Sequence, residues 1–194
     1  MNFRHDESVA MHPRLFSGKL GCITDVKVKL DIDPNVRPLK QSLRPVAIHL
    51  RDAVERELLK QLQQGIIERV EVNSDPSTWI TNLVPVIKDR VKHNADEASK
   101  PIEVRLTTDS RVQNKAIRRA RHPGKTIEEL VYLVNGSNIF SKLDITKAFH
   151  QLELDEDSRN LTTITTHIGL FSYKRLHMSI SSAPEVFSET IRTI

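Results

Sequence analysis

The chain has 194 residues, of which 38% are hydrophobic and 28% charged, with 29 Lys and Arg against 25 Asp and Glu. This length suits one domain, or one domain with a smaller subdomain, and a net charge of +4 is too small to keep such a chain unfolded. The single cysteine, Cys22, excludes an internal disulfide framework and a cysteine-rich zinc site. No apolar stretch approaches the roughly 20 residues that span a bilayer. The N-terminal segment MNFRHDESVA lacks the apolar core of a signal peptide, so we expect a soluble, intracellular chain.

The first half of the chain carries two clear periodic patterns. Within residues 25–32, Val, Leu and Ile alternate with charged residues, which predicts a half-buried strand. Prolines then favour an extended chain up to about residue 45. Apolar residues, Leu59 among them, recur at helical spacing over 50–62, which predicts a helix with one buried face. Gly65 is placed to end that helix.

Two apolar segments flank a long charged stretch further along the chain. A turn cluster at 73–78 precedes a run rich in β-branched residues at 79–88, which predicts a strand. Alternating residues at 102–107 predict a second strand, and the polar residues 89–100 lie between the two. We therefore expect a β-hairpin with a long charged loop.

The last third of the chain predicts helices and strands in mixed order. Thr126 opens T-I-E-E, a capping box that begins a short helix, and the Asn-Gly that follows ends it. Segment 138–145 alternates like a strand, and 161–176 is typical of a hairpin that turns near Gly169. A second capping box at Ser182 begins a helix that lacks a C-terminal cap, so we expect a chain shorter than the complete fold. Mixed order of this kind favours the α+β class.

The common catalytic signatures are absent from the sequence. The eight histidines form no H-E-x-x-H, the six glycines form no phosphate loop, and there is no G-x-S-x-G. Asp144 follows the predicted strand at 138–145, where a carboxylate is suited either to bind magnesium or to serve as a turn residue. One basic cluster, containing no acid, is either a solvated loop or a nucleic-acid contact. Its members are Arg111, Lys115, Arg118, Arg119, Arg121 and Lys125.

The segment FSKLDITKAFHQLEL, residues 140–154, resembles the first catalytic motif of the reverse transcriptases of gypsy-type LTR retrotransposons. In that motif F-S-K-L-D is followed by two or three variable residues, an aromatic residue and H-Q. Other blocks resemble the same family in the same order, and together they span nearly the whole chain. They are the opening of the polymerase at 12–34, the first fingers strand at 77–88, the D-x-R-x-x-N block within 104–117 and the S-A-P-E-x-F motif within 175–189.

The resemblance implies a role for five residues around an incoming nucleotide. Asp144 would bridge the two magnesium or manganese ions that polymerases use, and the carbonyl of Ile145 would help to hold the nucleotide's metal. Phe149 would be the steric gate that excludes a 2′-hydroxyl, or else a core residue. Arg105 would grip the triphosphate and Lys88 would reach the same phosphates. The alternative for these two is an ordinary exposed cation on a hairpin.

Five further residues are implied to lie near the template. Asp109, Arg111 and Asn114 match the D-x-R-x-x-N block, which would support the fingers and contact template, or they form a purely structural salt-bridged turn. Pro184 matches the S-A-P-E-x-F motif. Ser179 stands where the family usually has glycine, and its side chain is expected to crowd the approach of template–primer or nucleotide.

The expected fold is α+β, the fingers and partial palm of a right-hand polymerase, reverse transcriptase-like and truncated before the second catalytic motif. The chain contains no adjacent Asp-Asp pair, so the family's Y/F-x-D-D block has no counterpart. The expected divisions are a polar tail at 1–11, an extended lead-in at 12–45, a fingers subdomain at 46–137 and a partial palm at 138–194.

The implied activity is RNA-directed DNA polymerisation by two-metal nucleotidyl transfer in the complete protein. Asp144 is the only one of three expected carboxylates, so the isolated chain is expected to be inactive. The implied partners are an RNA or DNA template–primer, deoxynucleoside triphosphates and the downstream palm, thumb, RNase H and integrase segments of the same polyprotein, with no membrane. The implied location is cytoplasmic or particle-associated, and a nuclear location stays open. The alternative is a non-catalytic retrotransposon remnant that at most binds nucleic acid.

Overall fold

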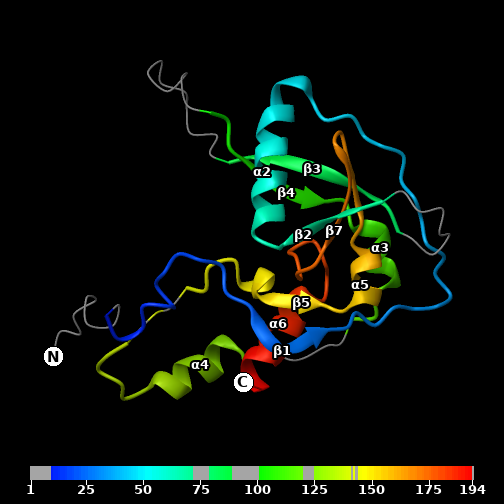
Figure 1. The fold of residues 1–194 in the computed structure, drawn as a ribbon. Helices are drawn as coiled ribbons and strands as arrows, with labels where there is room; N and C mark the ends of the chain where they lie inside the picture. The colour runs from blue at the N-terminus through cyan, green and yellow to red at the C-terminus, as the bar shows by residue number, and fades with distance from the viewer. Residues whose placement is uncertain are drawn as a thin grey trace.

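The structure, a computed structural model, describes residues 10–71, 79–88, 101–119, 125–140, 142 and 144–193. The predicted turn at 73–78 and the predicted loop at 89–100 lie outside these residues. Helices and strands alternate in mixed order along the chain (Figure 1). They are β1 (Ile23–Val28), η1 (Ile48–Leu50), α2 (Arg51–Gln63), β2 (Ile67–Val70), β3 (Thr81–Ile87), β4 (Val104–Thr108), α3 (Arg111–Ala116), α4 (Ile127–Val134), η3 (Ala148–Gln151), β5 (Leu152–Leu154), α5 (Glu156–Leu161), β6 (Ile164–Thr166), β7 (Gly169–Tyr173) and α6 (Ala183–Thr193).

The larger sheet has five strands in the order β2-β7-β6-β3-β4. The β3–β4 pair is antiparallel, as the two apolar segments predict, and so is the β6–β7 pair expected over 161–176. Gly169 lies at the start of β7 with φ +124°, a conformation that side chains other than glycine rarely adopt. β3 and β6 pair in parallel, so one sheet joins the expected fingers segment 46–137 to the expected palm segment 138–194.

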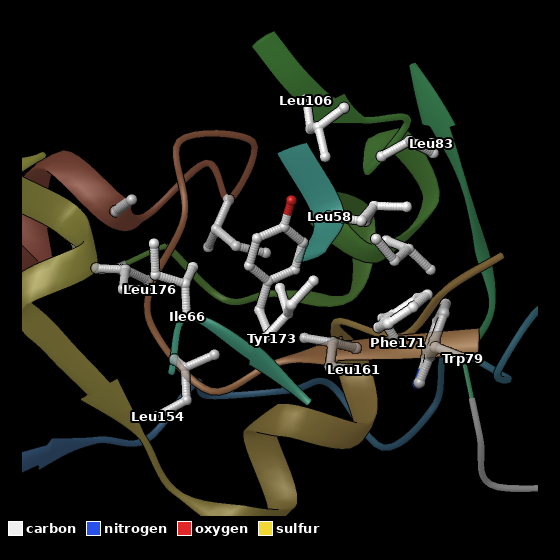
Figure 2. Packing of buried hydrophobic residues seen from close by; sticks show 14 of the residues in the cluster. Leu58, Ile66, Trp79, Leu83, Leu106, Leu154, Leu161, Phe171, Tyr173 and Leu176 are labelled. Carbon is white, nitrogen blue, oxygen red and sulfur yellow. The ribbon is translucent and has the colours of Figure 1, made fainter. Parts of the chain in front are cut away.

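Helix α2 lies across the sheet and forms the core with it (Figure 1). Its apolar stripe is buried at Val54 and Leu58, both 0% exposed, and Gly65 follows the helix in a left-handed conformation, as predicted. Leu59 is 40% exposed and does not belong to the buried face. Figure 2 shows side chains from α2, α5 and both hairpins meeting in this core, with Phe171 and Tyr173 of β7 among them. Burying such side chains is the main stabilising contribution to the fold.

A second, smaller sheet pairs β1 with β5 in parallel. The predicted alternation at 25–32 is confirmed for Val28 and Leu30, which are buried. Val26 is 37% exposed, so the core contacts of β1 come from its two ends, where Val28 is buried and Ile23 is partly buried against the core.

Segment 138–145 is the clearest error of the sequence-based expectations. Its described residues form no strand, and Ile139 and Phe140 are 76% and 66% exposed. Alternation alone does not make a strand, because a strand also needs a hydrogen-bonding neighbour. The strand of this region comes later, as β5, after the short helix η3.

Helix capping was predicted twice, with different outcomes. Thr126 accepts a hydrogen bond from the Glu129 N–H, and the Glu129 side chain accepts one from the Thr126 N–H, so the first capping box is confirmed. Helix α6 also forms, but the buried Ser182 hydroxyl has no hydrogen-bond partner among the described residues. The capping box predicted there is therefore wrong, although the helix itself is right.

Candidate functional site

A pocket of about 410 Å³ collects side chains from α2, the β3–β4 hairpin, the η3 segment and the loop that follows β7. It brings together four residues that the sequence predicted for a nucleotide or template site: Lys88, Arg105, Phe149 and Ser179. Other residues of the lining include Glu57, Lys147, His150, Tyr173, His177 and Met178.

The hairpin places Lys88 and Arg105 on one side of the pocket. Arg105 lies between two buried residues of β4, Val104 and Leu106, so strand alternation turns its side chain outward. Lys88 follows β3, and its N–H donates to the Glu103 carbonyl at 2.9 Å. The Lys88 ammonium lies 3.6 Å from a Glu103 carboxylate oxygen. Because this ion pair is exposed, it holds the lysine only weakly.

Phe149 lies on η3, where it both lines the pocket and packs against the core. Its ring meets that of Phe187 edge to face, with centroids 5.8 Å apart and planes at 83°. This arrangement is favourable for aromatic pairs and fixes the ring's orientation. Phe149 can therefore be a core residue and still present its ring to the pocket, so the two roles expected for it do not exclude each other.

Ser179 is bonded into the protein from both its side chain and its backbone. Its hydroxyl accepts a hydrogen bond from the Thr108 N–H at 3.2 Å, and its carbonyl accepts one from Asn114 Nδ2 at 2.9 Å. The Asn114 side-chain oxygen in turn accepts from the Ser181 N–H at 2.9 Å. The hydroxyl is thus held against the end of β4, which accommodates the serine at a position where glycine was expected.

His177 and Tyr173 form a buried floor beneath the pocket. Their rings stack with centroids 4.2 Å apart, and His177 Nδ1 accepts a hydrogen bond from the Ser179 N–H at 3.3 Å. Burial lowers the pKa of His177 to about 3, with a smaller contribution from His150, and burial raises the pKa of the Tyr173 hydroxyl. Both rings are therefore neutral near pH 7, and the floor carries no charge.

His150 lies beside them on η3 and lines the same pocket. Burial, and then the charges of Lys147 and Arg175, lower its pKa to about 4. Its buried Nδ1 has no hydrogen-bond partner among the described residues. The pocket thus combines three cations, Lys88, Arg105 and Lys147, and one acid, Glu57, with aromatic and neutral groups. An excess of cations beside aromatic rings suits a ligand with a polyanionic end and a flat, less polar part.

Asp109 and Arg111 lie outside the pocket and bind each other. The guanidinium donates to both carboxylate oxygens, at 2.6 and 2.7 Å, and this hydrogen bonding lowers the pKa of Asp109. The geometry is that of the salt-bridged turn. Asn114 differs, because its bonds connect α3 to the loop beside the pocket. Pro184 is exposed at the start of α6 and does not line the pocket.

The basic cluster is partly neutralised by acids from distant parts of the chain. Arg118 lies 3.6 Å from Asp33, and Arg119 donates to Glu185 at 2.7 Å. Arg121 lies outside the described residues. The absence of acids within the cluster's own sequence therefore does not make it a free cationic patch.

Asp144 and Ile145 are exposed and do not line the pocket. Among the described residues, no group of three or more His, Cys, Asp or Glu side chains is placed to hold a metal ion. A single exposed carboxylate does not fit a divalent metal centre, which needs several oxygen ligands. The described residues therefore do not build the metal site that the resemblance implies.

Several pocket residues carried no usable signal in the sequence. Lys147, His150 and His177 are single residues whose neighbours show no periodicity that marks a site. His150 follows Phe149 in the first motif and His177 lies two residues before Ser179, so each is close in sequence to a predicted residue. Only the fold, which brings η3 beside the β3–β4 hairpin, shows that they share a pocket.

No helix within the described ranges is long and apolar enough to cross a membrane. No protein-family model matches the chain.

Comparison with known proteins points to one class of polyprotein. The chain is 26% identical over 157 residues to the Retrovirus-related Pol polyprotein from transposon 297 of Drosophila melanogaster, which covers 81% of this chain and 14% of that protein. It is 35% identical over 131 residues to the corresponding polyprotein from transposon 412 of the same species, which covers 68% of this chain and 10% of that protein. The chain thus spans a small part of the length of its relatives.

Solved structures agree on the fold. The crystal structure of the prototype foamy virus protease-reverse transcriptase matches with a TM-score of 0.70 and 14% identity, over 100% of this chain and 25% of that one. The chain has a reverse-transcriptase-like fold. A foamy viral protease-reverse transcriptase in complex with double-stranded DNA matches with a TM-score of 0.65 and 15% identity, over 99% of this chain and 32% of that one. Together with the polyprotein relatives, this places the chain among homologues of retrotransposon and retroviral Pol proteins.

Proposed function

We propose that this chain is the nucleotide-binding part, fingers and first part of the palm, of the RNA-directed DNA polymerase of a gypsy-type LTR retrotransposon polyprotein. The observation that carries the proposal is the pocket, in which Lys88, Arg105, Phe149 and Ser179 meet although they come from separate motifs of the sequence. The resemblance implies a nucleotide or template role for each of these residues.

The chemistry of the pocket suits a deoxynucleoside triphosphate. Arg105 and Lys88 offer charge-assisted hydrogen bonds to phosphate oxygens. The Phe149 ring lines the pocket and packs against Phe187, and we infer that it would contact the sugar of a bound nucleotide. A 2′-hydroxyl against its apolar face would lose hydrogen bonds to water without replacement. A ribonucleotide is therefore disfavoured.

Template–primer is the second proposed partner. Asn114 and Ser179 connect α3 to the loop beside the pocket, which supports a surface on which a template base could rest. A nucleic-acid duplex is bound by a relative of the same fold, the foamy viral protease-reverse transcriptase. For the metal, we propose that Asp144 and the Ile145 carbonyl are this chain's share of a magnesium or manganese site, and the remaining ligands would come from outside the described residues.

Nucleotide binding tests the proposal directly. Arg105→Gln should weaken dATP binding roughly ten- to hundred-fold, the usual cost of losing a charged hydrogen bond. Arg192→Gln, at an exposed position near the end of α6, is the matched control and should change the affinity less than about twofold. Isothermal titration of the wild-type chain with dATP is the measurement. Absence of dATP binding, with salt-dependent binding of a poly(rA)/oligo(dT) duplex retained, would instead support the non-catalytic remnant.

Primer extension tests whether this chain can add nucleotides without the rest of the polyprotein. We expect the 194-residue chain by itself to add no nucleotide to poly(rA)/oligo(dT) with magnesium or manganese, because one carboxylate cannot position two cations. Extension that is lost in Asp144→Ala would contradict this expectation.

A further inference from the structure

Lys147 lies in the first motif between Asp144 and Phe149, at one of the positions where the family motif is variable. The resemblance therefore assigns it no role. In the structure its side chain lines the pocket with Lys88 and Arg105. Within the described residues it is the one residue other than glycine with a positive φ, at φ 49° and ψ 45°. Such a conformation costs an ordinary residue roughly 1 kcal/mol or more, and residues of this kind concentrate at functional sites.

Lys147 shares the pocket lining with two other cations, Lys88 and Arg105, and with one acid, Glu57. Its ammonium donates a hydrogen bond to the neutral side-chain oxygen of Gln64 at 2.7 Å, at the end of α2. A cation that shares a pocket with two further cations gains more from an arriving anion than an isolated surface lysine does.

We propose that Lys147 is a third phosphate-binding cation of the pocket, which leaves Gln64 and contacts the polyphosphate of the bound nucleotide together with Lys88 and Arg105. The exchange is favourable because an ammonium–phosphate hydrogen bond is stronger than one to a neutral amide. Three cations also favour a triphosphate over a monophosphate. This inference rests on the proposed function, since it requires that the pocket bind a polyphosphate.

Inorganic tripolyphosphate is the probe, because it has neither base nor sugar and isolates the phosphate contacts. Lys147→Gln should weaken its binding roughly ten- to hundred-fold. Lys147→Arg should keep most of the affinity. Lys142→Gln, an exposed lysine of the same segment that does not line the pocket, is the matched control and should change the affinity less than about twofold. Lys147→Gly provides a second loss of the cation in a variant that removes the backbone strain and should be at least as stable as wild type.

The outcomes separate this inference from the function on which it rests. If wild type binds neither tripolyphosphate nor dATP, the proposed function fails and the inference with it. If wild type binds both and Arg105→Gln weakens them, while Lys147→Gln and Lys147→Gly bind as wild type does, the function stands and the role of Lys147 is wrong. A loss of affinity in both Lys147 variants, with Lys142→Gln unchanged, supports the role.

Discussion

The pocket and the segment 125–146 belong to the same chain but differ in how they are held. The pocket is bounded by α2, the β3–β4 hairpin and the loop after β7, all anchored in one buried core. The segment 125–146 contains α4, in which every side chain is exposed, and Asp144, which is exposed as well. Figure 1 shows α4 set apart from the larger sheet.

This contrast separates two parts of a polymerase site. The residues proposed to bind the nucleotide are positioned by contacts within the described chain. The residues proposed to bind metal are not, because Asp144 is exposed and, in the part of the chain that the structure describes, no group of three or more His, Cys, Asp or Glu side chains is placed to hold a metal ion. The apolar side chains of α4, such as Tyr132 at 80% exposure, are an unusually exposed apolar surface for a folded domain. Substitutions in the pocket region and in the segment 125–146 can test whether the two regions differ in how tightly they are packed.

The largest effect is expected in the core beneath the pocket. Leu58→Ala should lower the free energy of unfolding by about 2–5 kcal/mol, because it removes a fully buried side chain and leaves a cavity between α2 and the sheet. Urea denaturation followed by circular dichroism measures the change. A loss below about 1 kcal/mol would mean that α2 is not packed as described.

The second largest effect on stability is expected when the pH is lowered, because the histidines beneath the pocket are then protonated in the unfolded chain. The folded-state pKa of His177, about 3, lies below its ordinary value of 6.5, so between these values the unfolded chain binds a proton that the folded chain does not. Stability is therefore full above about pH 6.5 and falls as the pH decreases, with His177 contributing about 2 kcal/mol of the loss by pH 5. His150, with a pKa of about 4, acts in the same direction.

Denaturation at pH 7.5 and pH 5 checks this effect. His177→Gln should reduce the difference between the two pH values, whereas His49→Gln, at an exposed site, should leave it unchanged. An equal pH dependence in wild type and His177→Gln would contradict the burial of a neutral imidazole.

A smaller effect is expected at Ser179. Ser179→Ala should cost about 1 kcal/mol, because the Thr108 N–H loses its acceptor, and the exposed Ser188→Ala should cost almost nothing. Ser179→Gly should not improve dATP affinity, since the hydroxyl already faces β4. A clear gain of affinity in the glycine variant would show that the hydroxyl crowds the pocket after all.

The smallest effect on stability is expected in the segment 125–146. Leu133→Ala in α4 should change the free energy of unfolding by less than about 0.5 kcal/mol, because this leucine is 56% exposed. Set beside Leu58→Ala, it measures the contrast between a packed and an uncovered helix. A loss comparable to that of Leu58→Ala would show that α4 packs against the rest of the chain.

Elements with strong local signals were predictable from the sequence. The apolar stripe of α2 and the capping box at Thr126 need only neighbouring residues to specify a helix, and both helices form as expected, although Leu59 of the predicted stripe is exposed. The hairpin of β3 and β4 was also found, because each strand carries a run of apolar residues long enough to recognise. The strands β2 and β5 and the helix α5 were missed, since so few residues cannot establish a period.

Features that depend on distant partners were not predictable in the same way. The segment 138–145 alternates as a strand would, but its described residues pair with no neighbouring strand. Arg119 was read as part of an acid-free patch, yet Glu185, far along the chain, pairs with it. The motifs predict four residues of the pocket from the sequence, whereas only the fold shows that Lys147 and His177 also line it.

Hydrogen–deuterium exchange in the presence and absence of dATP compares the two regions in a single measurement. We expect slower exchange with dATP in the peptides that contain β4, η3 and residues 176–180, and no change in the peptide of α4. Protection of α4 without protection of the pocket peptides, or no change anywhere at saturating dATP, would contradict the claim that this pocket is a nucleotide site.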